Sequence, residues 1–291
     1  MNLKRGRKIK GLLTADLQCG SRLCPIPPDL ELPTISWKPN KGQLYLWEKW
    51  QNMMEILPKR LDFWVHLGET LQGPASKKGS SYELLTNDPE EQAMIAKAML
   101  APIVERVKKH PAGGKSFWLC RGSGWHEGEY GRAADMVAEK LGAQKFPNGE
   151  QSGDVLDLNF DGLICNLSHH SAVFMIYFST PLEREMKFFS EGAAQIEAEI
   201  DGEMRAVIPD VVARAHTHRE VVVERNGRVA VSVPGWMLAT RYAIKKSVAR
   251  AWPSLGFTLL WLDPEAKKRG RRATWHETIL YPHPRRRAVT L

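Results

Sequence analysis

The sequence predicts a layered α/β fold, in which two β-sheets pack face to face and helices cover their outer sides. Strand-like apolar runs alternate with helical stretches along the chain, and this pattern favours a layered α/β domain over an all-α or all-β one. Five of the apolar runs are followed by polar side chains of the kind that bind metal ions. Such positions meet at one edge of an open α/β sheet. With 43% hydrophobic and 25% charged residues, the 291-residue chain has the composition of a soluble globular protein, which excludes a disordered or collagen-like chain.

The first half of the chain is expected to contain three strands with helices between them. Lys10–Ala15 is a short apolar run that ends at Asp16, and a proline-rich loop, Cys24–Pro39, follows it. The near-helical spacing of the apolar residues in Lys41–Ile56 predicts an amphipathic helix, whose tryptophan-rich stripe we interpret as core packing. The other elements expected here are strands at Asp62–Gly68 and Ser116–Arg121 and helices at Pro89–Lys109 and Tyr130–Leu141.

The second half is richer in strands. Two runs, Val155–Phe160 and Leu163–Ser168, flank Asp161-Gly162, which is typical of a tight hairpin. Pro181–Ile200 is expected to be helical, and Val211–Ala215 is expected to be a strand that ends at His216. Further strands are expected at Glu220–Glu224, Arg228–Pro234, Phe257–Leu262 and Thr274–Tyr281. We expect residues 1–263 to form one domain and residues 264–291 to be a basic C-terminal strand and tail that closes it.

The cellular location of the protein and the redox state of its cysteines are predicted from features that the sequence lacks. No run approaches the roughly 18 apolar residues of a membrane span, and Met1–Lys10 leads into an apolar patch too short for a signal peptide. We therefore expect a cytoplasmic protein that does not contact a membrane. The four cysteines, Cys19, Cys24, Cys120 and Cys165, lack the spacing of a zinc site or a disulfide framework, so we expect buried or incidental thiols.

The net charge of +8 is concentrated at the two ends of the chain. Residues 1–10 carry five basic and no acidic side chains, and residues 264–291 carry eight basic and two acidic ones. The ends together contribute +11, so residues 11–263 have a net charge of −3. This distribution suggests two basic arms that contact a polyanion such as DNA or RNA. The alternative is that the tails only improve solubility.

Potential metal ligands follow five successive apolar runs. They are Asp16 with Gln18, Glu69, Ser123 with His126, His169 with His170, and His216 with His218. Carboxylates and imidazoles without thiolates suit Mn²⁺, Fe²⁺ or Zn²⁺ rather than a cysteine-based structural site. A single histidine of this kind is more often a core residue, but five independent strand ends are hard to attribute to chance.

At these residues the sequence resembles the calcineurin-like metallophosphoesterases. The signature of that family is D-x-H, G-D, G-N-H-[D/E], a histidine at a strand end, and G-H-x-H, in this order. The corresponding stretches here, which lie within roughly residues 10–235, are Asp16-Leu17-Gln18, Gly68-Glu69, Gly122-Ser123-Gly124-Trp125-His126-Glu127, Ser168-His169-His170 and Ala215-His216-Thr217-His218. Flanking segments are similar to a phage and prophage branch of the family: Cys19–Pro25, Gln43–Trp47, Arg121–His126 and Pro234–Trp236.

The resemblance implies an αββα sandwich of the metallophosphoesterase type, with residues 1–263 as the catalytic domain. It also implies two divalent metal ions that activate a hydroxide for in-line attack on a phosphoester. Asp16, Gln18 and His218 would hold one ion, and His169, His216 and Ser123 the other, with Glu69 as the bridge. His170 is a further candidate ligand beside His169. His126 would protonate the leaving oxygen. Arg121 or Arg219 would bind the phosphate, or be a solvated surface charge.

Three positions depart from the family signature in ways that affect metal binding. Gln18 replaces a histidine, Glu69 replaces the bridging aspartate, and Ser123 replaces an asparagine. A carboxamide oxygen is a weaker donor than imidazole for Zn, Fe or Mn. These departures leave three hypotheses: an enzyme with an asymmetric metal pair, a one-metal enzyme, or a phosphate- or nucleic-acid-binding protein without activity.

The expected activity is metal-dependent phosphoester hydrolysis. The basic ends and the phage-like segments favour a phosphodiesterase or nuclease. If the gene is carried by a phage, the protein would act in the host cytoplasm. A small-molecule phosphatase or a cyclic-nucleotide phosphodiesterase is the enzymatic alternative.

Overall fold

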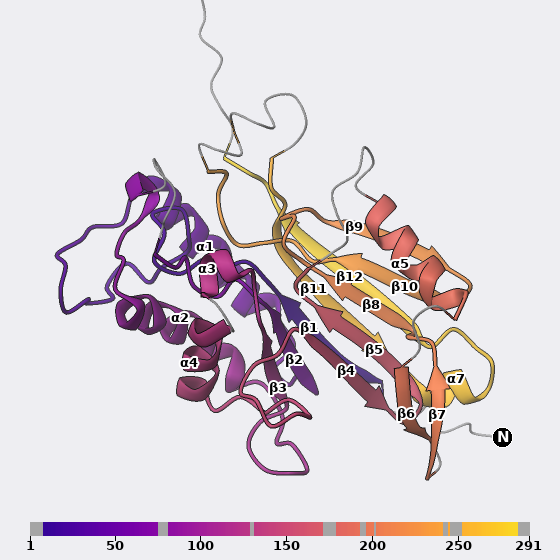
Figure 1. Cartoon of the computed structure of the whole chain (residues 1–291). Coiled ribbons are helices and arrows are strands. Elements are labelled where there is room, and N and C mark those ends of the chain that lie inside the picture. Colours follow the sequence, from indigo (N-terminus) through magenta and orange to yellow (C-terminus); the bar gives the residue numbers. More distant parts are fainter. Residues whose placement is uncertain are drawn as a thin grey trace, which may run out of the picture.

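Two five-stranded mixed sheets lie face to face in the computed structural model, which describes residues 8–74, 81–128, 131–170, 179–192, 196–200, 202–240, 244 and 252–284 (Figure 1). The first sheet has the order β12-β11-β1-β2-β3. Its strands are β1 (Ile9–Thr14), β2 (Phe63–Leu67), β3 (Phe117–Cys120), β11 (Leu255–Leu262) and β12 (Thr274–Tyr281). Strands β1, β2 and β3 are parallel, whereas β11 runs antiparallel to β1, and β12 antiparallel to β11.

The second sheet has the order β4-β5-β8-β10-β9. Its strands are β4 (Val155–Phe160), β5 (Leu163–Ser168), β8 (Val211–Arg214), β9 (Val221–Arg225) and β10 (Arg228–Ser232). The central strands β5, β8 and β10 are parallel, and the two edge strands are antiparallel to their neighbours. Each sheet therefore presents the carboxyl ends of three parallel strands.

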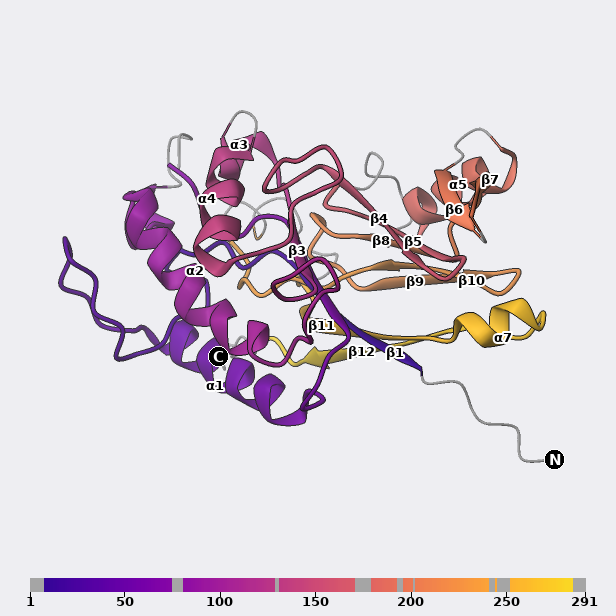
Figure 2. The same ribbon diagram turned by 90° about the horizontal axis from the view of Figure 1, so that it is seen from below.

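Successive side chains of a strand point to opposite faces of the sheet, and this alternation builds separate cores on the two faces. Leu13 and Val65 of the first sheet pack against Leu167 and Val231 of the second. Their neighbours Leu12 and Trp64 face the other way, into a cluster with the helices that cover the first sheet. The molecule consequently has four layers, and Figure 2 shows the helices on the two outer sides of the sheets. The predicted αββα sandwich is confirmed.

Three helices cover the outer face of the first sheet: α1 (Lys41–Ile56), α2 (Pro89–Val104) and α4 (Arg132–Leu141). The start of α1 is stabilised by a capping box, in which Asn40 and Gln43 exchange side-chain and backbone hydrogen bonds. The tryptophan stripe of α1 is core packing, as expected, because Trp50 is buried against Trp236.

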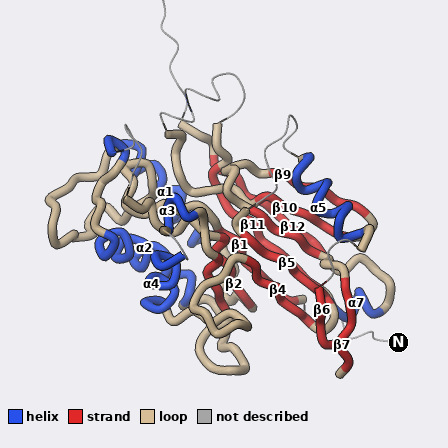
Figure 3. Tube along the Cα trace, viewed as in Figure 1, coloured by secondary structure: helices blue, strands red, loops and turns tan. Residues whose placement is uncertain are grey.

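The outer face of the second sheet carries α5 (Thr180–Ser190). Leu182 and Met186 pack on Val212 and Ala230, and Glu185 forms a 2.7 Å ion pair with the buried Arg214. In Figure 3, helices α1, α2 and α4 lie on one side of the strands and α5 lies on the other.

Two of the expected elements are wrong. The helix expected at Pro89–Lys109 ends at Val104, because the backbone of Arg106 and Lys108 pairs with Leu61 instead. The helix expected at Pro181–Ile200 ends at Ser190, and Ile196–Ile200 is strand β6, paired with β7 (Glu203–Val207). Apolar and acidic residues alternate in Ile196–Ile200, which is the period of a strand rather than of a helix. Two short helices, α3 (Gly124–Glu127) and α7 (Pro264–Lys268), were not anticipated.

The basic ends lie partly outside the described residues, which exclude 1–7 and 285–291. Lys8 lies over the ring of Trp275 at 3.9 Å, and β12 is an edge strand of the first sheet. All four cysteines are buried free thiols, in agreement with the prediction. Within the described residues, none of the helices combines the length and the hydropathy that crossing a membrane requires.

Candidate metal centre

The five ligand-bearing segments converge because each directly follows a parallel strand. Asp16 follows β1, Glu69 follows β2 and Ser123 follows β3, while His169 and His216 follow β5 and β8 of the other sheet. Two backbone hydrogen bonds, Asp16 N–H to the Gly68 carbonyl (3.0 Å) and Gln18 N–H to the Glu69 carbonyl (2.8 Å), hold the first two segments together.

The backbone of these segments is strained. Among the described residues, seven non-glycine residues have a left-handed φ, and five of them are ligand candidates: Asp16, Gln18, Glu69, His216 and His218, with φ of 48–70°. The other two, Asp161 and Asn226, occupy hairpin turns, where such φ values are common. Strained residues cluster at functional sites and persist only where the surrounding structure holds them in place.

Glu69 is at the centre of the cluster. Its Oε2 accepts a hydrogen bond from Gln18 Nε2 (2.7 Å), and its Oε1 accepts one from Ser123 Oγ (2.8 Å). His169 Nε2 and His216 Nδ1 lie 3.3 and 3.4 Å from Oε1, and His218 and His126 each place Nε2 3.9 Å from Oε2. The carboxylate is only 2% exposed, so protein groups rather than water surround it.

Two backbone carbonyls fix the imidazole orientations. Nδ1 of His169 lies 2.6 Å from the Leu67 carbonyl, and Nδ1 of His126 lies 2.8 Å from the Gln72 carbonyl. A carbonyl only accepts, so each Nδ1 carries a proton and each Nε2 faces the cluster. Metal-ligating histidines usually have their other ring nitrogen held by a carbonyl, a carboxylate or water in this way.

The charges in the cluster are strongly coupled. Burial by itself raises the pKa of Glu69, but hydrogen bonds from His169, His216 and His218 outweigh it and hold the pKa well below its ordinary value. Burial raises the pKa of Asp16, against the opposing charges of His218 and His169. Burial lowers the pKa of His169, but its hydrogen bond to Glu69 and the charge of Asp16 outweigh this and raise the pKa to about 9. The two buried carboxylates thus require compensating positive charge.

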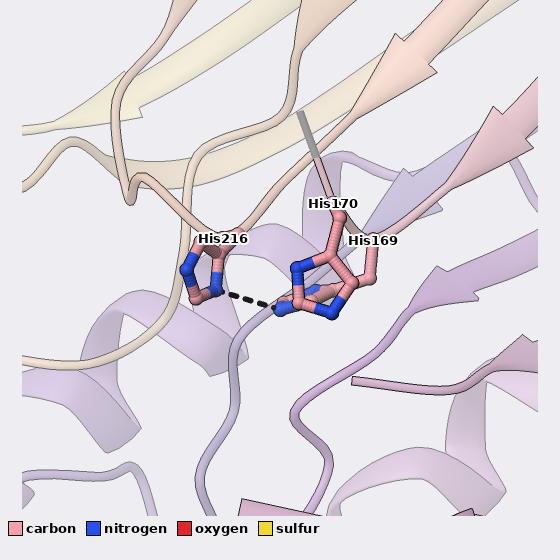
Figure 4. Close-up of side chains that lie close together, drawn as sticks. All are labelled: His169, His170 and His216. Carbon is pink, nitrogen blue, oxygen red and sulfur yellow. Dashed lines mark hydrogen bonds between the residues drawn. The ribbon is translucent and has the colours of Figure 1, made fainter. Parts of the chain in front are cut away.

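The donor set fits divalent metal ions. Both carboxylate oxygens of Asp16 and the Oε1 of Gln18 are buried without a hydrogen-bond partner among the described residues. A buried polar atom without a hydrogen-bond partner costs free energy, which indicates that these oxygens bind a ligand. Two sets of side chains place their donor atoms within 4.8 Å of one another: Asp16 with Glu69 and His169, and His169 with His170 and His216. Figure 4 shows the three imidazoles converging, with the 3.0 Å contact of His169 Nε2 and His216 Nδ1.

Glu127 is a further residue of the site, and the sequence predicted no role for it. This fully buried carboxylate accepts hydrogen bonds from the backbone N–H groups of Thr70 and Gly122, and so joins the segments after β2 and β3. Burial raises its pKa to about 7, although both N–H groups act in the opposite direction. One sequence feature could have identified Glu127 as a site residue. It ends the Gly122–Glu127 stretch, at the position where the signature of the metallophosphoesterases has an acidic residue.

Gly122 allows the close approach that this site needs. A Cβ atom there would lie 2.4 Å from the backbone nitrogen of Glu69 and 2.7 Å from its Cγ. Glu69 therefore packs directly on the backbone of the loop after β3, and any side chain at position 122 would displace it.

The structure separates the expected site residues into three groups. Asp16, Gln18, Glu69, Ser123, His126, His169, His216 and His218 lie together, with His170 at the exposed rim. Arg121 is instead engaged by Glu150 (3.1 Å) and Asp135 (3.7 Å), which indicates a structural role. Arg219 follows His218 and is half-buried, and burial lowers its pKa. The phosphate-binding role of either arginine stays a prediction.

No protein-family model matches this sequence, and no curated protein matches it. Among solved structures, the chain is similar to Vacuolar Protein Sorting 29 from Cryptosporidium parvum, with 12% identity over 94% of this chain and 98% of that chain and a TM-score of 0.41. It is also similar to an archaeal phosphodiesterase, with 11% identity, 94% and 100% coverage and a TM-score of 0.42. Vps29 from Entamoeba histolytica complexed with Zn²⁺ matches with 11% identity, 94% and 99% coverage and a TM-score of 0.40.

Proposed function

We propose that this protein is a metal-dependent phosphoester hydrolase, with a phosphodiester as its preferred substrate. The observation that carries the proposal is the polar cluster around Glu69. Side chains from the ends of four other strands face this carboxylate, and three buried oxygens of Asp16 and Gln18 have no hydrogen-bond partner within the described residues. A cluster that served only stability would be expected to satisfy these atoms internally.

The residues divide between two metal ions. Asp16, Gln18 and His218 would hold one ion, and His169, His216 and Ser123 the other, with Glu69 shared and His170 beside the second group. When bound, the pair supplies an activated water and positive charge that stabilises the phosphoryl oxygens. Mn²⁺, Fe²⁺ and Zn²⁺ all suit carboxylate and imidazole donors.

His126 has the geometry of a general acid. Its Nδ1 is anchored on the Gln72 carbonyl, and its Nε2 points toward Glu69 and Gln18 from 3.9 and 3.4 Å. The side chain is 18% exposed, so a substrate can reach it. In its protonated form, Nε2–H would donate its proton to the leaving oxygen.

A binding protein without activity is the second candidate, and one contact favours it. The amide nitrogen of Gln18 donates to Glu69 Oε2 at 2.7 Å, so one oxygen of the expected bridge already has a protein partner. A metal ion at this position would require the Gln18 amide to turn, so that its oxygen faces the ion. If the amide stays as it is, a phosphate-binding module or a one-metal site is the better description.

Metal content and turnover distinguish these candidates. We expect the purified chain to contain up to two equivalents of transition metal and to hydrolyse bis-p-nitrophenyl phosphate with added Mn²⁺. Glu69→Ala should abolish both properties, whereas the control Glu139→Ala, on the exposed face of α4, should keep both. A chain that binds no metal and shows no turnover would contradict the hydrolase. Nuclease activity and the phage-type branch stay predictions from the basic ends and the flanking segments, and assays on DNA and RNA would test the first.

A further inference from the structure

A buried glutamine of α2 is connected through the backbone to the proposed general acid, His126. Gln92 lies near the start of α2 and is completely buried. Its Oε1 accepts a hydrogen bond from the Gly73 N–H (2.9 Å), and its Nε2 donates to the carbonyls of Gly73 (3.1 Å) and Thr86 (2.9 Å). The oxygen and both N–H groups of the carboxamide can thus be engaged at the same time, which fixes the side chain in one orientation.

A single peptide group joins Gln92 to His126. The Gly73 N–H that donates to Gln92 belongs to the same peptide group as the Gln72 carbonyl. That carbonyl accepts a hydrogen bond from Nδ1 of His126 at 2.8 Å. A trans peptide group is planar, and its N–H and C=O bonds point in opposite directions. Rotation of this group would break both hydrogen bonds at once, so the oxygen of Gln92 sets the direction of the carbonyl that holds His126.

The loop that carries this peptide group packs closely on α3. A Cβ atom at Gly73 would lie 2.1 Å from the carbonyl oxygen of His126, so the backbone of the loop rests directly on the backbone of the helix. The Gln72 side chain is buried as well. Hydrogen bonds that follow one another in such surroundings polarise each other. The bond from Gly73 to Gln92 therefore makes the Gln72 carbonyl a stronger acceptor for His126.

We propose that Gln92 is a positioning residue that keeps the imidazole of His126 in the tautomer and orientation suited to proton donation. The proposal rests on the proposed function of His126 as general acid. While the Nδ1 proton is bound to the Gln72 carbonyl, the proton for the leaving oxygen comes from Nε2, and the imidazole that remains is neutral with its proton on Nδ1. Without Gln92 the peptide group can turn, and the fraction of imidazoles in the productive geometry falls.

The test compares Gln92→Met with the control Gln43→Met in the full-length protein. Methionine is unbranched, and it replaces the carboxamide by an apolar group that adapts to its surroundings. Gln43 is also buried, and its carboxamide likewise contacts backbone groups, the Asn40 N–H at 3.1 Å and the Ser21 carbonyl at 3.5 Å. The control therefore loses a buried amide of the same kind that is not bonded to the peptide group facing His126.

The first measurement is hydrolysis of bis-p-nitrophenyl phosphate, with metal content and melting temperature determined for each variant. Gln92→Met should lower kcat by about 10–10²-fold, the loss that a small misplacement of a reacting group causes, with KM and bound metal unchanged. Gln43→Met should keep the kcat of the wild type. If Gln92→Met does not fold, Gln92→Asn, which withdraws the carboxamide by one methylene, takes its place in every comparison.

The second measurement is the tautomer of His126, which does not depend on turnover. Nitrogen NMR spectra of histidine-labelled, Zn²⁺-loaded protein distinguish a proton on Nδ1 from one on Nε2, and the signals that disappear in His126→Ala identify this residue. We expect the Nδ1-protonated form in the wild type and in Gln43→Met. In Gln92→Met the Nε2-protonated form should become populated.

A double-mutant cycle shows whether Gln92 acts through His126. In the His126→Ala background, Gln92→Met should lower kcat no further, because the two residues are coupled. The same loss of kcat in both backgrounds, an unchanged tautomer in Gln92→Met, or an equal loss of kcat in Gln43→Met would overturn the proposal. A wild-type protein that hydrolyses nothing would refute the proposed hydrolase, and the tautomer of His126 in Gln92→Met would then decide alone whether Gln92 positions this side chain.

Discussion

Separate alanine substitutions of His169 and His126 should distinguish metal binding from proton transfer. His169 belongs to both sets of side chains that could hold an ion, and its Nε2 lies within 3.3 Å of Glu69 and 3.0 Å of His216. His126 belongs to neither set, and its Nε2 comes no closer than 3.9 Å to Glu69. His169→Ala therefore removes a direct ligand, whereas His126→Ala leaves the proposed donors of both ions in place.

The expected magnitudes follow from these positions. His126→Ala should lower kcat by roughly 10²–10⁴-fold, the usual contribution of one general acid, which corresponds to about 2.7–5.4 kcal/mol of transition-state stabilisation. His169→Ala should weaken metal binding by more than the roughly 10–100-fold that loss of an outer-shell partner causes, because a direct donor is removed. Activity of this variant should be lost at metal concentrations that saturate the wild type.

Elemental analysis after gel filtration, together with hydrolysis of bis-p-nitrophenyl phosphate, measures both effects. Far-ultraviolet circular dichroism confirms that each variant is folded. If His126→Ala and His169→Ala lose the same fraction of bound metal, then His126 is a ligand and its role as general acid is wrong. If neither variant loses metal, the cluster is not a metal centre.

Three further predictions concern the surroundings of this cluster. Gln18→His should tighten the weaker metal site in calorimetric titrations, because imidazole is a better donor than an amide oxygen, and an unchanged isotherm would show that Gln18 is not a ligand. Gly122→Ala should lower kcat/KM by about 10²-fold, since a Cβ would displace Glu69, while Gly124→Ala, where the added Cβ meets no neighbour, serves as the control. Burial lowers the pKa of His66 to about 3 in the folded chain. The contribution of the neutral imidazole to the free energy of unfolding is therefore present above pH 6.5 and is lost as pH falls toward 3. Between pH 6.5 and 5 this loss amounts to about 2 kcal/mol, and His66→Gln should remove it from urea-unfolding profiles; parallel profiles of the two proteins would contradict this reasoning.

The sequence by itself determined the fold class and most of the candidate ligands. Apolar runs with a polar residue at the end are a local pattern, so the strands before Asp16, Glu69, His169 and His216 could be predicted together with the edge where they meet. The turn Asp161-Gly162 likewise defined its hairpin with the observed bounds. The helix expected at Pro181–Ile200 was wrong, because its second half alternates with the period of a strand and pairs with a segment further along the chain.

Only the tertiary structure decided which polar groups meet and which are already paired. Arg121 stands beside the ligand motif in sequence, but Glu150 and Asp135 engage its guanidinium. Glu127 joins two loops through backbone N–H groups that no sequence pattern specifies. The basic C-terminal segment lines a cavity because a hairpin more than 40 residues upstream packs against it. Such contacts depend on how distant segments pack in space, and the periodicity of a single segment carries no information about them.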